Sequence, residues 1–220
     1  MRRLGIALAV ALVLAVTSAP ASADQSSRSL VLHARFTGLV AAASWTTCPQ
    51  PEVGDVCVDT EVLAFDSASR EGKVRDRGPT MRTLTFVYRV VGGEFGTVLV
   101  TEWFGRTEVA AVNGAPRLGR ATAAGTVPVV LCSVFDPTAG FTCPGEVAVD
   151  LTWTGTGALT RLAEHDVARN EFRMENIWTR GWQRTATVSG SVGGSVLGTL
   201  SAAELLRVRQ GEVVVQRPVP

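Results

Sequence analysis

The sequence predicts an all-β fold, an antiparallel two-layer sandwich or flattened barrel that is stapled by two disulfides. Apolar and polar residues alternate with period two along many short stretches, which is typical of half-buried strands. Glycine and proline separate these stretches at short intervals, as they do in sandwiches and barrels. The four cysteines stand in two local pairs, and each pair encloses a segment rich in turn residues.

The alternation also defines the expected strands and turns. Gly92-Gly93 marks a tight turn between two alternating stretches, which predicts a hairpin. Gly193-Gly194 marks a second turn, and Gly211 divides the last alternating stretch in two. In chain order, the expected strands cover 30–37, 83–90, 97–104, 147–153, 182–192, 196–200, 205–209 and 213–215.

Three segments depart from the strand pattern. Ser201 to Glu204 has the spacing of a capping box, which predicts one helical turn before Leu205. Segment 161–170 is polar, and we interpret it as a long loop or a short helix. Segment 67–79 mixes acidic and basic residues, so a solvated loop is favoured over a binding patch.

The cysteine spacing favours one of the three possible disulfide pairings. A hairpin brings its flanks together, so Cys48–Cys57 and Cys132–Cys143 need little reach. Closing loops of this length stabilises the fold by roughly 2–3 kcal/mol each. A metal site is the rival interpretation, but nearby histidines and close cysteine pairs are missing from the sequence.

The two cysteine loops are also similar to one another. Each lies between stretches that alternate, which raises the hypothesis of two similar half-sheets produced by duplication. Alternation by itself generates the same likeness between unrelated hairpins, so both explanations stay open.

The N-terminus predicts export. Arg2 and Arg3 precede an apolar run from Leu4 to Val16, and the small residues Ala21-Ser22-Ala23 form a cleavage site. The alternative, a membrane anchor, is disfavoured because the run is shorter than the roughly 20 residues that span a bilayer. We therefore expect residues 1–23 to be a cleaved signal peptide and residues 24–220 to be a single secreted β domain without a membrane span.

The charge of the mature chain bears on its partners. Removing Arg2 and Arg3 from 21 basic residues leaves nineteen, against 20 acidic ones, so the formal net charge becomes −1. Nucleic-acid binding usually shows as a basic surplus. No nucleic-acid partner is therefore expected, and the partner is predicted to be an unknown extracellular ligand or an envelope surface.

The sequence contains no convincing catalytic, metal-binding or cofactor motif, so no cofactor is expected. Only His33 and His165 could act as a histidine base, and neither stands in a recognisable triad. Two pairs of carboxylates, Asp59 with Glu61 and Glu102 with Glu108, have the period of one strand face. Such pairs could serve glycoside hydrolysis, but they occur more often on the solvated side of a strand.

The five tryptophans offer the strongest candidate for binding. Most tryptophans in strands fill the core between sheets. Trp178 and Trp182 differ because they share one strand face and lie next to Arg180 and Arg184. These four residues form a candidate ligand platform that could stack on sugars or apolar ligands, with burial in the core as the alternative.

Several short motifs together suggest a relationship. They are Phe36-Thr37-Gly38, Ala43-Ser44-Trp45, Val-Asp-Leu-Thr-Trp-Thr-Gly-Thr-Gly at 149–157 and Gly211-Glu212-Val213-Val214. The chain thereby resembles an uncharacterised family of secreted bacterial, largely actinobacterial, all-β proteins over most of its mature length. The resemblance implies one exported β domain and carries no activity or site residues.

The sequence thus favours a secreted, non-catalytic binding or envelope-associated β module. Two alternatives stay open. One is a secreted hydrolase with a site near His33 or His165, and the other is a purely structural extracellular protein.

The first testable prediction concerns processing. Because Ala21 and Ala23 occupy the small-residue positions of a signal-peptidase site, exported protein should begin at Asp24. N-terminal sequencing of material from the medium checks this, and soluble exported chain that retains Met1 would contradict it.

Overall fold

A computed structural model describes residues 30–216, apart from 72–73, 93–95, 109, 116, 170–172 and 194–197. The expected signal peptide, 1–23, lies outside the described residues. The elements are β1 (Leu30–Thr46), β2 (Val56–Glu71), β3 (Val74–Gly92), β4 (Gly96–Thr107), β5 (Ala111–Gly114), β6 (Arg120–Val134), the short 3₁₀ helix η1 (Pro137–Ala139), β7 (Glu146–Gly155), β8 (Thr160–Arg169), β9 (Arg173–Val192) and β10 (Thr199–Gln216).

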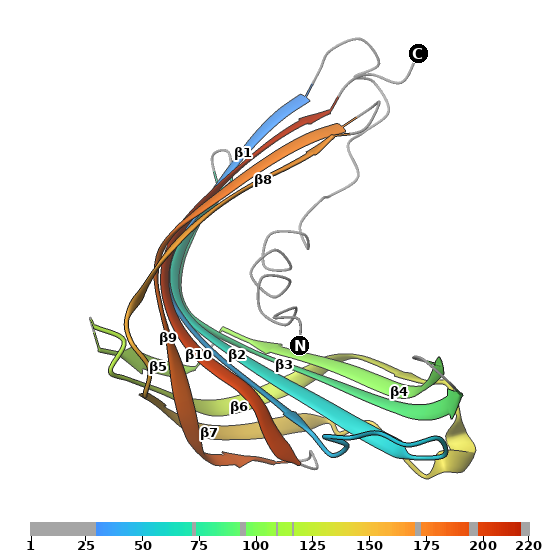
Figure 1. Ribbon diagram of the computed structural model, residues 1–220. Coiled ribbons are helices and arrows are strands. Elements are labelled where there is room, and N and C mark those ends of the chain that lie inside the picture. Colours follow the sequence, from blue (N-terminus) through green and yellow to red (C-terminus); the bar gives the residue numbers. More distant parts are fainter. Residues whose placement is uncertain are drawn as a thin grey trace, which may run out of the picture.

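The predicted all-β, antiparallel fold is confirmed. Neighbouring strands follow the order β10-β1-β2-β3-β4-β6-β7-β9-β8, and β9 also pairs with β10. In the described part of the chain, eight strands therefore close into a ring, while β8 extends the sheet from β9 and β5 pairs only with β6. In Figure 1 the ring is flattened into two layers.

The strands are long and strongly bent, so the molecule has two halves (Figure 1). In the two-layered half, residues 186–192 of β9 pair with β7. In the other half, residues 173–185 of β9 pair with β10, and residues 174–183 pair with β8 as well. There β8, β9, β10, β1 and β2, with the first part of β3, form a single layer, called the upper sheet below (Figure 1).

Alternation gives the sheet two faces of different composition. We call the side on which β6 and β7 pack the outer face, and the opposite, concave side the inner face (Figure 1). Odd-numbered residues of β1, such as Leu39 and Ala41, belong to the outer face and enter the core between the layers. Even-numbered ones, such as Phe36 and Val40, belong to the inner face, as expected for a period of two.

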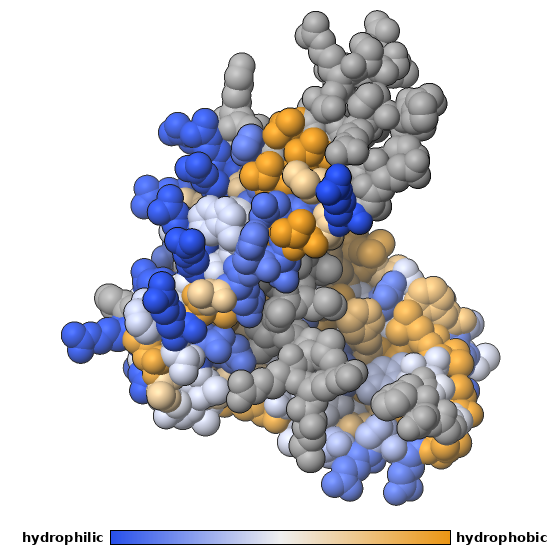
Figure 2. All heavy atoms as spheres, turned by 45° about the horizontal axis from the view of Figure 1, so that its top comes forward, coloured by the Kyte–Doolittle hydropathy of each residue, from blue (hydrophilic) through white to orange (hydrophobic). Residues whose placement is uncertain are grey.

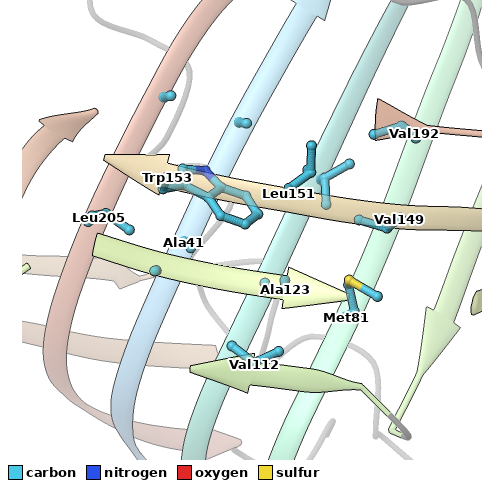
Figure 3. Packing of buried hydrophobic residues seen from close by; sticks show 14 of the residues in the cluster. Ala41, Met81, Val112, Ala123, Val149, Leu151, Trp153, Val192 and Leu205 are labelled. Carbon is cyan, nitrogen blue, oxygen red and sulfur yellow. The ribbon is translucent and has the colours of Figure 1, made fainter. Parts of the chain in front are cut away.

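The main core lies between the two layers and is centred on Trp153 of β7 (Figure 3). This side chain is fully buried, and its Nε1 donates a hydrogen bond of 2.9 Å to the carbonyl of Ala42 in the opposite layer. Leu151 and Leu205 are buried in the same cluster. The tryptophan thus joins the layers by packing and by one buried hydrogen bond.

A smaller cluster occupies the inner face of β1, β2 and β10. The rings of Phe36 and Phe65 meet edge to face at 6.3 Å, and the Arg82 guanidinium lies 5.6 Å from the centre of the Phe65 ring. Leu206 and Val208 of β10 complete it on the other side of β1.

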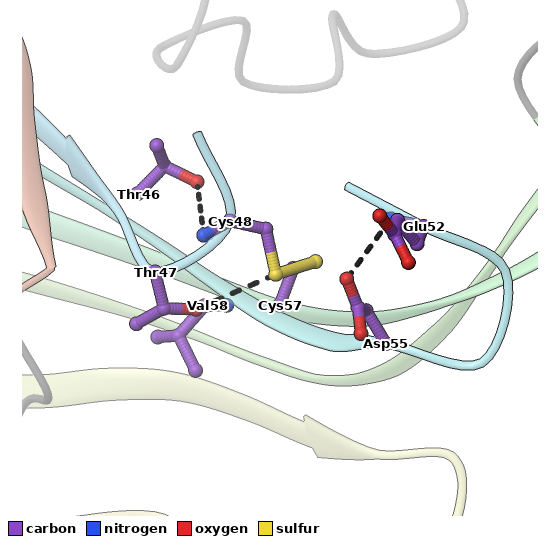
Figure 4. The surroundings of a disulfide bond; sticks show 7 residues. All are labelled: Thr46, Thr47, Cys48, Glu52, Asp55, Cys57 and Val58. Atoms are coloured by element: carbon purple, nitrogen blue, oxygen red, sulfur yellow. Dashed lines mark hydrogen bonds between the residues drawn. A yellow bond between two sulfur atoms is a disulfide. The ribbon is translucent and has the colours of Figure 1, made fainter. Parts of the chain in front are cut away.

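Both predicted disulfides are present. The Cα–Cα distances are 5.5 Å for Cys48–Cys57 and 6.1 Å for Cys132–Cys143. Near the first, Thr47 Oγ1 accepts a hydrogen bond of 2.8 Å from the Val58 amide (Figure 4). The two stapled connections, β1 to β2 and β6 to β7, belong to opposite layers.

Three local expectations were wrong. Segment 67–79 was expected to be a loop, but β2 and β3 continue through it as a paired hairpin. Segment 161–170, expected to be a loop or short helix, forms β8 over Thr160–Arg169. Both are polar on each face because the upper sheet is a single layer, so no apolar alternation marks them as strands.

The third error concerns the C-terminal segment. Ser201 to Glu204 is part of β10 rather than a capped helical turn, because Ala202, Ala203 and Glu204 pair with β1 and Ser201 lies at the β-bulge next to them. Local capping is worth only about 1 kcal/mol and is overridden by a ladder of backbone hydrogen bonds. Gly211 does not interrupt β10 either, since the strand runs through it to Gln216.

The buried hydrogen bond of Trp153 generates a stability prediction. Trp153→Phe removes the bond to Ala42 and leaves space in the core, so the free energy of unfolding should fall by about 1–3 kcal/mol. Trp182→Phe is the matched control, because its exposed ring should change stability by no more than about 0.5 kcal/mol. Urea unfolding measures both, and equal midpoints for the two variants would contradict the assigned role of Trp153.

Candidate functional site

The predicted platform residues all lie on the outer face of one strand. Trp178, Arg180, Trp182 and Arg184 occupy alternate positions of β9, which places their side chains on the same side of the upper sheet. Trp182 is 47% exposed and Trp178 is partly exposed. The other tryptophans are buried, as most tryptophans in strands are expected to be: Trp45, Trp103 and Trp153.

The indole of Trp178 lies against Gly211 of the neighbouring strand. Its register partner on β10 is Gly211, and a Cβ atom at that glycine would collide with the indole atoms Cζ2, Cε2 and Nε1. The absence of a side chain at position 211 is therefore what lets the indole rest on the β10 backbone. The sequence suggested that Gly211 divides the last strand. In the structure it lies within β10 and leaves room for the aromatic ring of Trp178.

Arginines surround the two rings. Arg180 stands directly opposite Arg209 of β10, and Trp182 lies between Arg161 of β8 and Arg207 of β10. All four of these arginines are exposed. Across the outer face of the upper sheet, exposed arginines occur at positions 35, 70, 75, 77, 161, 169, 180, 207 and 209.

Acidic residues gather on the other face. Among the described outer-face positions of the upper sheet, Asp66 is the one carboxylate. The acidic residues of β8, β9 and β10 alternate onto the inner face: Glu164, Asp166, Glu175, Glu204 and Glu212. Figure 2 shows hydrophilic side chains gathered along the outer side of the bend, at the left of the view. Among the described residues of β8, β9 and β10, arginines therefore lie on the outer face and carboxylates on the inner face.

Arg184 plays a different part from its neighbours. Its Nε donates a hydrogen bond of 2.7 Å to the carbonyl of Gly157, and its aliphatic stem packs close to Gly155. It thereby joins β9 to the segment that follows β7. By contrast, Arg180, Arg207 and Arg209 form no ion pair with any described residue. We define the arginine–tryptophan face as Trp178, Trp182, Arg161, Arg180, Arg207 and Arg209.

Both histidines lie on the outer face of the upper sheet and are exposed. His165 of β8 is the register partner of Trp178, and its Nε2 is hydrogen-bonded to Asn176 Oδ1 at 2.9 Å. Its sequence neighbours Glu164 and Asp166 point to the opposite face, so they do not orient the ring. Among the described residues, no group of three or more potential metal ligands is found.

A hollow of about 450 Å³ lies on the inner face at the other end of the long strands. Asp59 and Glu61, which the sequence places on one strand face, line it together with Leu84 and Phe86. Burial raises the pKa of Glu61. Burial, followed by the charge of Asp59, also raises the pKa of Tyr88.

The second pair of carboxylates is separated. Glu102 is the register partner of Phe86 on the inner face, whereas Glu108 follows the end of β4 and pairs with Arg106 at 2.8 Å. Glu102 and Glu108 therefore do not form one acidic site.

Comparison with known proteins adds no assignment. No model of a known protein family matches the chain, and no curated protein or solved structure is significantly similar to it. In the described part of the chain, no helix has the length and apolar character needed to cross a membrane.

The raised pKa of Glu61 generates a pH prediction. The folded chain holds this proton more tightly than the unfolded chain does, so the stabilisation is present below the ordinary pKa of 4.5 and is lost as pH rises through the folded value. Glu61→Gln cannot titrate, so its free energy of unfolding should decline less than that of the wild type as pH rises above 4.5. Urea unfolding at a series of pH values tests this, and a wild-type slope in the variant would contradict it.

Proposed function

We propose that this protein is a secreted, non-catalytic binding module that attaches to an anionic polymer of the extracellular surface through the arginine–tryptophan face. The two disulfides support an oxidising, extracytoplasmic setting, because such bonds persist there and are rare in the cytosol. The exported destination follows from the predicted signal peptide.

The carrying observation is that arginines stand directly opposite one another on this face. Arg180 faces Arg209 across β9 and β10. Like charges in such cross-strand positions destabilise a sheet by a few tenths of a kcal/mol to about 1 kcal/mol. An anion bound between the two guanidinium groups would attract both of them and relieve their repulsion. The facing arginines therefore favour the binding of an anion.

The strands also hold the face in place before a ligand arrives. Each arginine in the group is attached to a strand paired on one or both sides, and the indole of Trp178 is seated on Gly211. A preformed array loses little conformational entropy on binding. Guanidinium groups suit this role because they form bidentate hydrogen bonds with carboxylate, sulfate or phosphate oxygens.

Local charge, rather than net charge, governs such binding. The whole chain has a formal net charge of only +1. Because alternation sends the carboxylates of β8, β9 and β10 to the inner face, the outer face is cationic although the chain is nearly neutral. At 0.1 M salt, charges on the protein surface are screened over a distance of roughly 10 Å. A ligand on the outer face therefore interacts mainly with the arginines of that face.

The proposal predicts a site-specific, salt-dependent interaction. The wild-type protein should be retained on immobilised dextran sulfate, and Arg180→Gln with Arg209→Gln should elute at clearly lower NaCl. The free energy of unfolding of this double variant should stay level or rise, because a repulsive pair has been removed.

The matched control is Arg117→Gln with Arg120→Gln, two exposed arginines outside the face. It removes the same charge and should elute as the wild type does. Equal losses in the test and control variants would show that net charge, not this face, determines retention. Failure of the wild type to bind would refute the proposal.

A further inference from the structure

The geometry points to a carboxylate-bearing polysaccharide as the ligand class of the arginine–tryptophan face, with a sugar ring stacked on Trp178. This inference rests on the proposed function and narrows it from any anionic polymer to one kind. It depends on three features: the contact between Trp178 and Gly211, the distance between the rings of Trp178 and Trp182, and the arginines that lie near both rings.

The contact of Trp178 with Gly211 makes its indole ring available for stacking with a ligand. The indole atoms Cζ2, Cε2 and Nε1 lie against Gly211, so contact with β10 fixes where the ring stands on the outer face. The ring is partly exposed in this position. A flat indole offers its electron-rich face to the slightly positive C–H groups on one side of a sugar ring, the same electrostatic preference that governs aromatic packing.

The arginines supply the partners for carboxylates. Arg180 lies two positions along β9 from Trp178, and Arg209 lies beside it on β10. Neighbouring strands are separated by about 4.8 Å, and residues two apart on a strand by about 6.7 Å. One carboxylate adjacent to a stacked sugar would therefore lie within reach of two guanidinium forks, each able to bind it in bidentate fashion.

The ring spacing argues against a nucleic-acid strand. Trp178 and Trp182 are four residues apart on one strand, which corresponds to about 13 Å. Bases of a stacked strand follow one another at about 3.4 Å, so proteins that bind single strands place aromatic platforms for successive bases. Two rings separated by an arginine suit instead a chain of bulky rings that carries charge at intervals.

The opposite face of the upper sheet favours the same class. Because this sheet is a single layer, Glu164 and Asp166 lie on the other side of the strands that carry the arginines. A densely charged polyphosphate that passed over the β8 edge would meet these carboxylates. A polymer with one carboxylate per sugar gains the arginine contacts with less repulsion beyond them.

Calorimetric titration of the exported chain with hexagalacturonate tests the inference, with a neutral cello-oligosaccharide and single-stranded oligo-dT of similar length as comparators. We expect hexagalacturonate to bind at least tenfold more tightly than either comparator. Trp178→Ala should weaken the affinity for hexagalacturonate about tenfold. Trp178→Phe should retain much of the affinity, because phenylalanine keeps a ring that can stack on the sugar. Binding should also quench tryptophan fluorescence in the wild type but much less in Trp178→Phe.

Gly211→Ala provides a second variant that keeps the indole and changes only its seat. It should weaken hexagalacturonate binding while leaving retention on dextran sulfate intact, and it decides the question if Trp178→Ala fails to fold. Equal affinity for oligo-dT, or uronate binding that neither variant alters, would overturn the sugar assignment and leave a charge-only surface. If the wild type bound neither hexagalacturonate nor dextran sulfate, the proposed function itself would be refuted.

Discussion

The pairing of β9 with three other strands is the constraint on which the rest of the structure depends. Its first part, 173–185, pairs with β10 and over 174–183 also with β8, and its last part, 186–192, pairs with β7. The same strand therefore closes the two-layered ring and carries the centre of the upper sheet. Because one continuous ladder serves both halves, the outer face of the sheet is apolar between the layers and cationic beyond them.

This continuity links core packing to the charged surface. Leu205 and Arg207 are neighbours on the same face of β10, yet the first is buried against the second layer and the second is exposed. A shift of register by one residue would send the arginines inward and the core side chains outward. The buried face in the two-layered half thus stabilises the register that keeps like charges together in the upper sheet, where repulsion alone would disperse them.

Much of the fold could be predicted from the sequence, because its signals are local. Alternation around Phe36 and Trp153 marked buried strands, and the short loops between the cysteines favoured the pairs that the structure contains. The segments around Asp166 and Arg75 were misjudged because strands exposed on both faces have no apolar stripe. Their signal was an alternation of charge instead, with Arg161 and Arg169 out of phase with Glu164 and Asp166.

The candidate site combines features that follow from local sequence with features that depend on strand pairing. The sequence by itself determined that Trp178, Arg180 and Trp182 share one strand face, because a strand repeats every two residues. Only the tertiary structure decided that this face is exposed, that Gly211 seats the indole, and that Arg207 and Arg209 stand beside it. These outcomes depend on which strands pair and in which register, and pairing is a property of residues far apart in the chain.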